Sequence, residues 1–264
     1  MRATVNGITI AYSDRGQGLP VVWLHAFPFN RTMWEGQVAG LSDRFRVIAV
    51  DLRGHGESDA PLWRYTLDLF ADDVVGLLDH LGIRQAVFAG LSMGGYTLFA
   101  LHRCHPERIK GLIFCDTRAE ADKPEQAAWR FNLAQQACKA GGAQPVADDM
   151  GPKLLAPATY RERPEIAARV RAISLSTPLS GVVGDLMAMA ERPDSTPQLA
   201  RIACPTLVIV GEDDALTTVA DNKRIADGIA GARLEIIPQA GHMSNMDQPK
   251  AFNRVVAEFL AGLT

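Results

Sequence analysis

The sequence predicts an α/β fold with a mostly parallel central sheet flanked by helices. Six short runs of apolar and β-branched residues recur along the chain, at 21–27, 46–52, 85–91, 109–117, 205–212 and 233–239. Amphipathic stretches with apolar residues at three- and four-residue spacing separate most of these runs. Continuous apolar strands that alternate with helices are typical of a parallel sheet covered on both faces. A chain of 264 residues is long enough for one such domain.

The composition is that of a folded protein with ordinary charge. Apolar residues make up 47% of the chain and the formal net charge is -3, so no general attraction to nucleic acid or anionic lipid is expected. No apolar run approaches the roughly 20 residues that cross a bilayer. The first residues lack the pattern of a secretory signal. We therefore expect a cytoplasmic protein with neither a nucleic-acid nor a membrane partner, and the sequence leaves the oligomeric state open.

The elements before the middle of the chain follow in a regular order. Residues 3–14 predict an antiparallel hairpin that turns at Asn6-Gly7. The strand at 21–27 then ends in a histidine and bulky residues, and the strand at 46–52 leads into the glycine-rich loop 51–59. That loop lacks the lysine and spacing of a nucleotide-binding loop. The amphipathic stretch 66–83 predicts a helix, and the strand at 85–91 follows it.

The alternation of strands and helices stops between about Arg118 and Arg201. Residues 123–142, 163–175 and 180–194 have helical patterns divided by Pro and Gly, with no convincing strand between them. We interpret residues 118–200 as a helical cap inserted into a core made of residues 1–117 and 201–264. The cap is not expected to be an independent domain.

The stretch AGLSMGGY, residues 89–96, carries the clearest chemical signature. It follows a predicted strand, places Ser92 between Gly90 and Gly94, and leads into an apolar helical run. A serine flanked by small residues can occupy a sharp turn from strand to helix, with its hydroxyl projecting from the sheet edge. The helix N-terminus that follows favours negative charge developing there. Ser92 is therefore the candidate nucleophile.

A serine nucleophile requires a base that is oriented by a third group. His242 follows the last predicted strand, and Asp214 follows the strand before it. The chain order Ser, Asp, His matches that of hydrolases with this strand–turn–helix motif. All three residues stand at strand ends, where α/β sheets bind their ligands. Ser92, Asp214 and His242 are thus predicted to form a catalytic triad, with Asp213 as the rival acid.

Nothing in the sequence predicts a metal or another cofactor. His102 and His105 lie near a predicted helix end before Pro106, with no third ligand close by. The cysteines have neither CxxC nor zinc-site spacing and are expected to be free thiols. They are Cys104, Cys115, Cys138 and Cys204.

The motifs LHAFPFN, DLRGHGESD, GLSMGGY, LVIVGEDD and AGHMSNMDQP together resemble the α/β-hydrolases that have a helical cap. Over nearly the whole chain the sequence is similar to 3-oxoadipate enol-lactonases, esterases and acyl-homoserine lactonases. The resemblance implies an oxyanion hole formed by the backbone amides of Phe27 and Met93. Ala26 departs from the glycine usual in this loop, and His25 is read as a residue that holds the loop. Arg53 and His55 are likewise read as structural.

The predicted nucleophile narrows the chemistry that this resemblance implies. Dehalogenases and epoxide hydrolases of this fold have aspartate at the position of Ser92, so acyl transfer to water is favoured instead. The leading hypothesis is the opening of a lactone, of acyl-homoserine lactone or 3-oxoadipate enol-lactone type. The alternatives are a broad short-chain carboxylesterase, then a C–C hydrolase or perhydrolase, and last a protein that only binds a small ligand.

Substrate choice is expected to depend on the cap and on the loops around Ser92. The tentative substrate-binding residues are Phe29, Trp129, Leu216 and Met243. An apolar pocket favours an acyl chain or a neutral lactone. A carboxylate, as in the oxoadipate enol-lactone, requires a cation such as Arg118 or Arg130. The sequence leaves the two kinds of pocket open.

Overall fold

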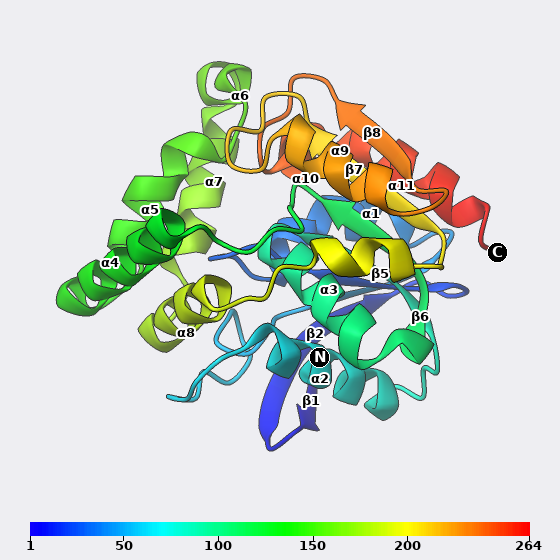
Figure 1. The fold of residues 1–264 in the computed structure, drawn as a ribbon, viewed down its shortest axis with the longest axis horizontal. Coiled ribbons are helices and arrows are strands. Elements are labelled where there is room, and N and C mark those ends of the chain that lie inside the picture. Colours follow the sequence, from blue (N-terminus) through cyan, green and yellow to red (C-terminus); the bar gives the residue numbers. More distant parts are fainter.

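The computed structural model describes all of residues 1–264. Eight strands form one sheet flanked by helices, in the order β1-β2-β4-β3-β5-β6-β7-β8 (Figure 1). The first two strands run antiparallel to their neighbours and all other pairs are parallel, which confirms the predicted fold class. The strands are β1 (Arg2–Val5), β2 (Ile8–Arg15), β3 (Pro20–Leu24), β4 (Arg46–Val50), β5 (Ala86–Leu91), β6 (Ile109–Cys115), β7 (Thr206–Gly211) and β8 (Arg233–Ile237).

Helices of the sheet-forming part of the chain connect these strands. They are α1 (Glu35–Leu41), α2 (Leu67–His80), α3 (Met93–Cys104), α9 (Val219–Gly228), α10 (Ser244–Asp247) and α11 (Pro249–Ala261). The helix α2 begins where its sequence predicts, because the Thr66 side chain accepts a hydrogen bond from the Leu69 amide at 3.1 Å. Short 3₁₀ turns occur at Arg31–Trp34, Pro106–Arg108, Gly151–Lys153 and Thr196–Arg201.

The predicted N-terminal hairpin is present. Val5 of β1 pairs with Ile8 of β2, and Asn6 and Gly7 between them have φ values of 49° and 76°. A two-residue hairpin turn of this hand requires positive φ at both central positions, which Asn-Gly supplies.

Five of the six predicted strands end one to three residues before their apolar runs do, and two of these ends matter for the site. The run at 21–27 is a strand only as far as Leu24, and the run at 109–117 only as far as Cys115. Asp116 has a φ of 45°, which a β-strand cannot contain. The residues after these two strands therefore form loops at the carboxyl edge of the sheet.

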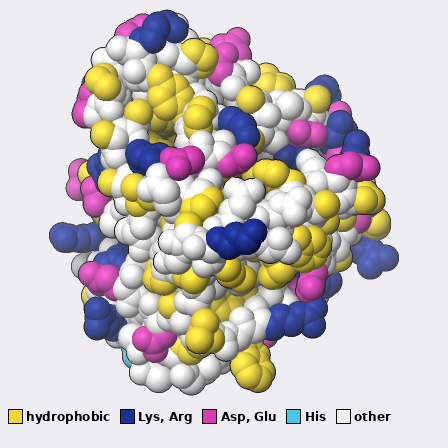
Figure 2. Space-filling view, turned by 90° about the vertical axis from the view of Figure 1, so that its left-hand side faces the viewer, with side chains coloured by type: hydrophobic (Ala, Val, Ile, Leu, Met, Phe, Trp, Pro, Cys, Tyr) yellow, Lys and Arg dark blue, Asp and Glu magenta, His cyan; other side chains and the backbone are white.

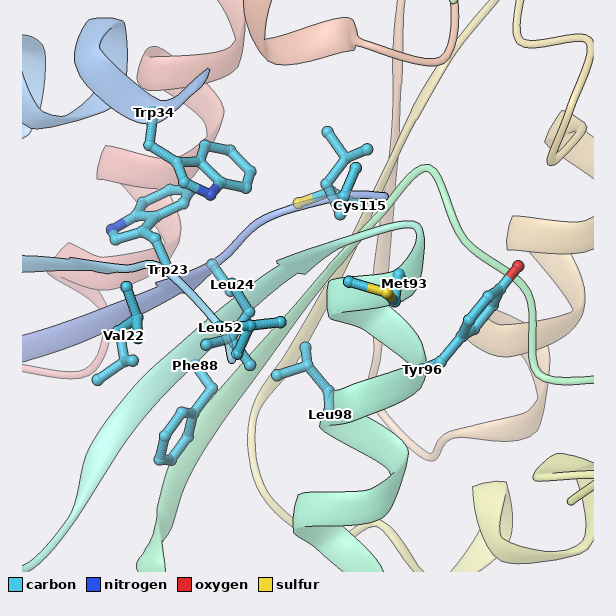
Figure 3. Close-up of a cluster of buried hydrophobic side chains, with 14 of the residues drawn as sticks. Val22, Trp23, Leu24, Trp34, Leu52, Phe88, Met93, Tyr96, Leu98 and Cys115 are labelled. Atoms are coloured by element: carbon cyan, nitrogen blue, oxygen red, sulfur yellow. The ribbon is translucent and has the colours of Figure 1, made fainter. Parts of the chain in front are cut away.

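A buried aromatic cluster fixes β3 within the core. The Trp23 and Trp34 rings lie 4.7 Å apart between centroids (Figure 3). The Phe252 ring lies 6.3 Å from that of Trp23. Figure 3 also shows Phe88 of β5 in the same core, with Met93 on the adjoining helix α3. Burying each side chain of this size contributes about 1.5–3 kcal/mol. The carboxyl ends of β3 and β5 are thus held in fixed positions.

Five helices between β6 and β7 lie together beyond one edge of this core (Figure 1). Three of them, α4, α7 and α8, fall within the stretches predicted to be helical. The sequence predicts no helix at α5 (Gln144–Met150) or α6 (Pro157–Glu162), because these helices have only seven and six residues and each has a proline in its first turn. The five helices are α4 (Pro124–Ala140), α5 (Gln144–Met150), α6 (Pro157–Glu162), α7 (Pro164–Leu175) and α8 (Leu179–Ala190).

The helix α8 rests directly on the glycine-rich loop 51–59. A Cβ added to Gly181 would lie 2.0 Å from the Gly54 carbonyl oxygen, so the two backbones touch. Beside this contact, His55 Nε2 lies 2.5 Å from Asp185 Oδ2, and both side chains are fully buried. Burial alone would lower the pKa of His55, but the Asp185 carboxylate raises it above its usual value. This buried pair ties α8 to the sheet-forming part of the chain.

The face formed by these five helices carries side chains of both charges. Figure 2 shows acidic and basic groups interspersed with hydrophobic ones over this face. No single helix of the chain is long and apolar enough to cross a membrane. Only α7 and α8 taken together reach the necessary length and composition, and they meet at a bend of 92°.

Candidate active site

The sheet topology opens a crevice between the loops that follow β3 and β5. Strand β3 lies between β4 and β5. The chain passes from β3 to β4 on one side and then crosses over to β5 on the other side, from where the later strands continue in that direction. Ligands of α/β sheets bind at such a switch point, outside the carboxyl ends of the strands. The loop after β3 carries Ala26 and Phe27, and the turn after β5 carries Ser92.

Ser92 occupies a strained turn between β5 and α3. Its φ of 53° and ψ of -109° are rare for a residue with a side chain. A Cβ on Gly90 would lie 2.4 Å from the Gly94 carbonyl carbon, and a Cβ on Gly94 would lie 2.2 Å from the Leu24 carbonyl oxygen. Both flanking positions therefore require glycine, and the turn presents the partly exposed Ser92 at the crevice.

His242 and Asp214 form a buried pair opposite this turn. His242 Nδ1 lies 2.9 Å from Asp214 Oδ2. Asp214 also accepts hydrogen bonds from the Leu216 amide at 2.8 Å and from the Thr217 hydroxyl at 2.6 Å. Burial alone would raise the pKa of Asp214, but His242 and the hydrogen bonds from Thr217 hold it below its usual value. Asp213, the rival acid, is exposed and is not a partner of His242.

Ser92 and His242 line one cavity of about 380 Å³. Trp129 and Leu216, both predicted to contact substrate, also line it. Phe29 and Met243 do not, because both are fully buried in the hydrophobic core. The sequence does not single out the remaining apolar lining residues, two from core segments and two from cap helices, because an apolar residue carries no mark of the direction in which it points. These are Tyr96, Met150, Met189 and Ala215.

Phe27 and Met93, whose backbone amides are predicted to form an oxyanion hole, both lie next to the cavity residue Ser92 or line the cavity themselves. Met93 is the first residue of α3, so its N–H has no acceptor within the helix. Phe27 follows β3, and its side chain lines the cavity. The Phe29 amide donates to the Ala26 carbonyl at 2.9 Å and closes the loop into a turn. The buried Ala26 side chain is accommodated within this turn.

His25 fixes the same loop through hydrogen bonds at both of its ring nitrogens. The Leu52 amide donates to His25 Nε2 at 3.0 Å, so Nδ1 carries the proton and donates to the Ala26 carbonyl at 2.8 Å. Burial, together with the neighbouring His55, sets the pKa of His25 well below its usual value. His25 is therefore a neutral residue that fixes the loop.

Of the cations that line the cavity, Arg118 alone has no carboxylate partner. Arg130 pairs with Asp122, and Lys153 pairs with Asp149 at 3.1 Å. Arg118 donates only to the Leu216 carbonyl, and its Nε is buried without a partner. Arg118 is thus the cation that remains free to bind an anion in this cavity.

The chain brings together no group of three or more His, Cys, Asp or Glu side chains that could hold a metal ion. His105 instead pairs with Asp72 at 2.7 Å. All four cysteines are free thiols.

Comparison with known proteins identifies the family. A family model described as the alpha/beta hydrolase fold matches residues 20–249. The chain belongs to this family. It is 35% identical over 257 residues to the 3-oxoadipate enol-lactonase 2 of Acinetobacter baylyi, covering 96% of this chain and 93% of that protein.

Two solved structures extend this similarity. A thermophilic esterase from Thermogutta terrifontis, described with malate bound, is 41% identical with a TM-score of 0.97, covering 100% of this chain and 99% of the esterase. An N-acyl homoserine lactone degrading enzyme is 31% identical with a TM-score of 0.84, covering 98% of this chain and 100% of the enzyme. The protein is therefore a hydrolase of the α/β-hydrolase family, related to enzymes of small-molecule esters and lactones.

Proposed function

We propose that the protein hydrolyses a carboxylic ester, most directly a lactone, through an acyl-enzyme formed on Ser92. The observation that carries this proposal is the cavity that Ser92 and His242 share, with Asp214 hydrogen-bonded behind the imidazole at 2.9 Å. A buried carboxylate on Nδ1 fixes the tautomer in which Nε2 is free to accept a proton. Ser92 is the nucleophile, His242 the general base and Asp214 the group that orients it.

The reaction proceeds in two acyl transfers. His242 Nε2 takes the proton of Ser92 Oγ as Oγ attacks the substrate carbonyl carbon. The amides of Phe27 and Met93 donate to the resulting oxyanion. The C–O bond to the leaving alcohol breaks, and His242 returns the proton to that oxygen. Water then attacks the acyl-enzyme with His242 again as base, which releases the carboxylic acid and restores Ser92.

Domain organisation follows from this assignment. Residues 1–117 and 201–264 supply the triad and the oxyanion donors. Residues 118–200 form the cap, which contributes Trp129, Met150 and Met189 to the cavity. In a lactone, the leaving alcohol remains tethered to the acyl group and must be held in the same cavity, between the core and the cap.

The cavity favours a small substrate that carries a carboxylate. A volume of about 380 Å³ is near the lower end of ligand pockets, which run from about 300 to 1,000 Å³. The guanidinium of Arg118 is the only lining cation without an anionic partner, and a planar guanidinium binds a carboxylate with two hydrogen bonds. We therefore favour a lactone of enol-lactone type over an acyl-homoserine lactone with a long chain. The relationship to the Acinetobacter baylyi enol-lactonase and to the malate-bound esterase supports this choice.

A panel of substrates tests the proposal. It contains 3-oxoadipate enol-lactone, acyl-homoserine lactones of several chain lengths and nitrophenyl esters of short acids. We expect the largest kcat/KM for the carboxylate-bearing lactone, and a loss of several orders of magnitude in kcat on every substrate for Ser92→Ala. A broad carboxylesterase is the second candidate, favoured by the 41% identical esterase. It would turn over neutral nitrophenyl esters at least as well as the lactones.

A further inference from the structure

The two residues that follow β6 contact all three loops that carry the proposed triad. We propose that Asp116 and Thr117, here called the β6 junction, position Ser92, Asp214 and His242 relative to one another. This inference rests on the proposed function, since it assigns a role in the same reaction. The junction residues do not touch substrate, and they act through the groups that do.

Asp116 joins the loop of the acid to the loop of the base. Its Oδ1 accepts a hydrogen bond from the Gly211 amide at 2.8 Å, three residues before Asp214. Its Oδ2 accepts a hydrogen bond from the Ser244 hydroxyl at 2.5 Å, two residues after His242. One carboxyl group thus links the two loops whose separation sets the distance between Asp214 and His242.

Thr117 joins the nucleophile to the acid. Its hydroxyl donates to the Ser92 carbonyl at 2.9 Å, and its amide donates to Asn222 Oδ1 at 3.1 Å. Asn222 Nδ2 in turn donates to the Thr217 carbonyl at 2.9 Å, and the Thr217 hydroxyl binds Asp214. A continuous chain of hydrogen bonds therefore runs from the Ser92 backbone to the Asp214 carboxylate.

Cys115, the last residue of β6, adds a further hydrogen bond to Ser92. The Ser92 amide donates to the Cys115 carbonyl at 3.0 Å. Figure 3 shows Cys115 and Met93, the neighbours of Asp116 and Ser92 in the chain, at the same end of the sheet. Both sides of the Ser92 peptide are therefore held by residues 115 to 117.

Both the backbone conformation and the burial of Asp116 are energetically unfavourable. Its φ of 45° lies in the left-handed region, and its side chain is fully buried. Burial and the nearby charge of Asp214 raise the pKa of Asp116 well above its usual value. Strained and desolvated groups of this kind cluster at functional sites, where the surrounding structure maintains them. The position joins the triad loops and makes no other side-chain hydrogen bonds.

Single substitutions at the ends of these hydrogen bonds test the positioning role without removing the buried carboxyl. Thr117→Val retains the packing of the side chain against Gly95 and removes only the bond to the Ser92 carbonyl. Its matched control is Thr206→Val. The buried Thr206 hydroxyl donates to the Cys204 carbonyl at 3.0 Å, and Thr206 begins β7, so it lies at the amino ends of the parallel strands and away from the triad. Both variants lose one hydroxyl and one hydrogen bond to a backbone carbonyl.

Ser244→Ala removes one of the two anchors of Asp116, and Ser58→Ala is its control. The buried Ser58 hydroxyl donates to the Asp51 carbonyl at 2.6 Å and accepts from the Ala11 amide at 2.8 Å, away from the triad loops. Ser58→Ala therefore loses one hydrogen bond more than Ser244→Ala does. We expect Thr117→Val and Ser244→Ala to lower kcat on the order of tenfold to a hundredfold with KM little changed, because small misplacements of reacting groups have effects of this size.

The controls separate positioning from simple stability. Thr206→Val and Ser58→Ala are expected to lower the melting temperature at least as much as the junction variants while leaving kcat unchanged. Equal kcat values for a junction variant and its control, or a loss that appears in KM rather than in kcat, would overturn the inference. Ser92→Ala is measured in parallel. Turnover that persists in Ser92→Ala refutes the proposed function itself, whereas an inactive Ser92→Ala with fully active junction variants refutes only the β6 junction.

Discussion

Replacing Arg118 by methionine tests how the cavity selects its substrate. Methionine retains an unbranched apolar stem and removes the guanidinium. Arg118 pairs with no carboxylate, so the substitution leaves no buried anion without a partner. Only the hydrogen bond to the Leu216 carbonyl is lost, which is worth about 0.5–1.5 kcal/mol of stability. The variant is therefore expected to remain folded.

The effect on catalysis follows from the interaction that Arg118 makes with substrate. A hydrogen bond to a charged group contributes about 1.5–3 kcal/mol. Arg118 is partly exposed, so the lower part of that range applies. At 1.4 kcal/mol for each factor of ten, a loss of about 1.5–2 kcal/mol lowers kcat/KM about 10- to 30-fold. The loss should appear only for substrates that carry a carboxylate.

The assay compares two lactones with the same ring, one with a carboxylate substituent and one with its methyl ester. The control variant is Lys153→Met, because Lys153 also lines the cavity but pairs with Asp149 and has a side chain that is 49% exposed. We expect Arg118→Met to lose activity on the acid and not on the methyl ester, with Lys153→Met near the wild type on both. Equal losses on both lactones, or no loss on either, would refute the assignment of Arg118 as the carboxylate anchor.

Three further predictions concern the nucleophile, the cap and the loop after β3. Ser92→Ala should leave stability unchanged and lower kcat by about 10⁴- to 10⁶-fold, as measured by steady-state turnover, because triad members act as a unit. Trp129→Ala should lower kcat/KM by up to about tenfold for lactones with an alkyl substituent, at about 0.8 kcal/mol for each methylene that loses its contact. Phe131 on the same helix is 42% exposed and lies outside the cavity, so Phe131→Ala should leave kcat/KM for these lactones unchanged. His25 has a pKa well below its unfolded value of about 6.5, so its contribution to stability is complete above that pH and is lost as the pH falls. Denaturant unfolding between pH 5 and 6.5 should show this loss in the wild type and a flatter profile in His25→Gln.

The sequence contains most of the information that positions the nucleophile. Gly90 and Gly94 are needed because the backbones on either side of Ser92 approach too closely for a Cβ. Continuous apolar runs predict buried parallel strands, and their ends place Asp214 and His242 at the same edge as Ser92. These features depend on local sterics and on periodicity, which a single sequence records directly.

The contacts between distant segments could not be predicted in the same way. Phe29 and Met243 lie within the motifs LHAFPFN and AGHMSNMDQP, yet both side chains are buried in the core. The sequence could not show this, because an apolar residue in a loop carries no sign of its direction. The choice between Arg118 and Arg130 depended on which of them Asp122 neutralises, and this is a tertiary fact. The apolar run predicts a strand over residues 109–117, which includes Asp116. The left-handed backbone of Asp116 instead ends β6 at Cys115.

Trapping the proposed acyl-enzyme on Ser92 tests the mechanism without relying on a variant. The enzyme is mixed with the best lactone or nitrophenyl ester of the panel, quenched in acid within the first turnover, digested and mapped by mass spectrometry. We predict that the peptide containing Ser92 gains the mass of the acyl group and that Ser92→Ala shows no such adduct. Complete turnover with no adduct on this peptide, or an adduct on another residue, would contradict the account.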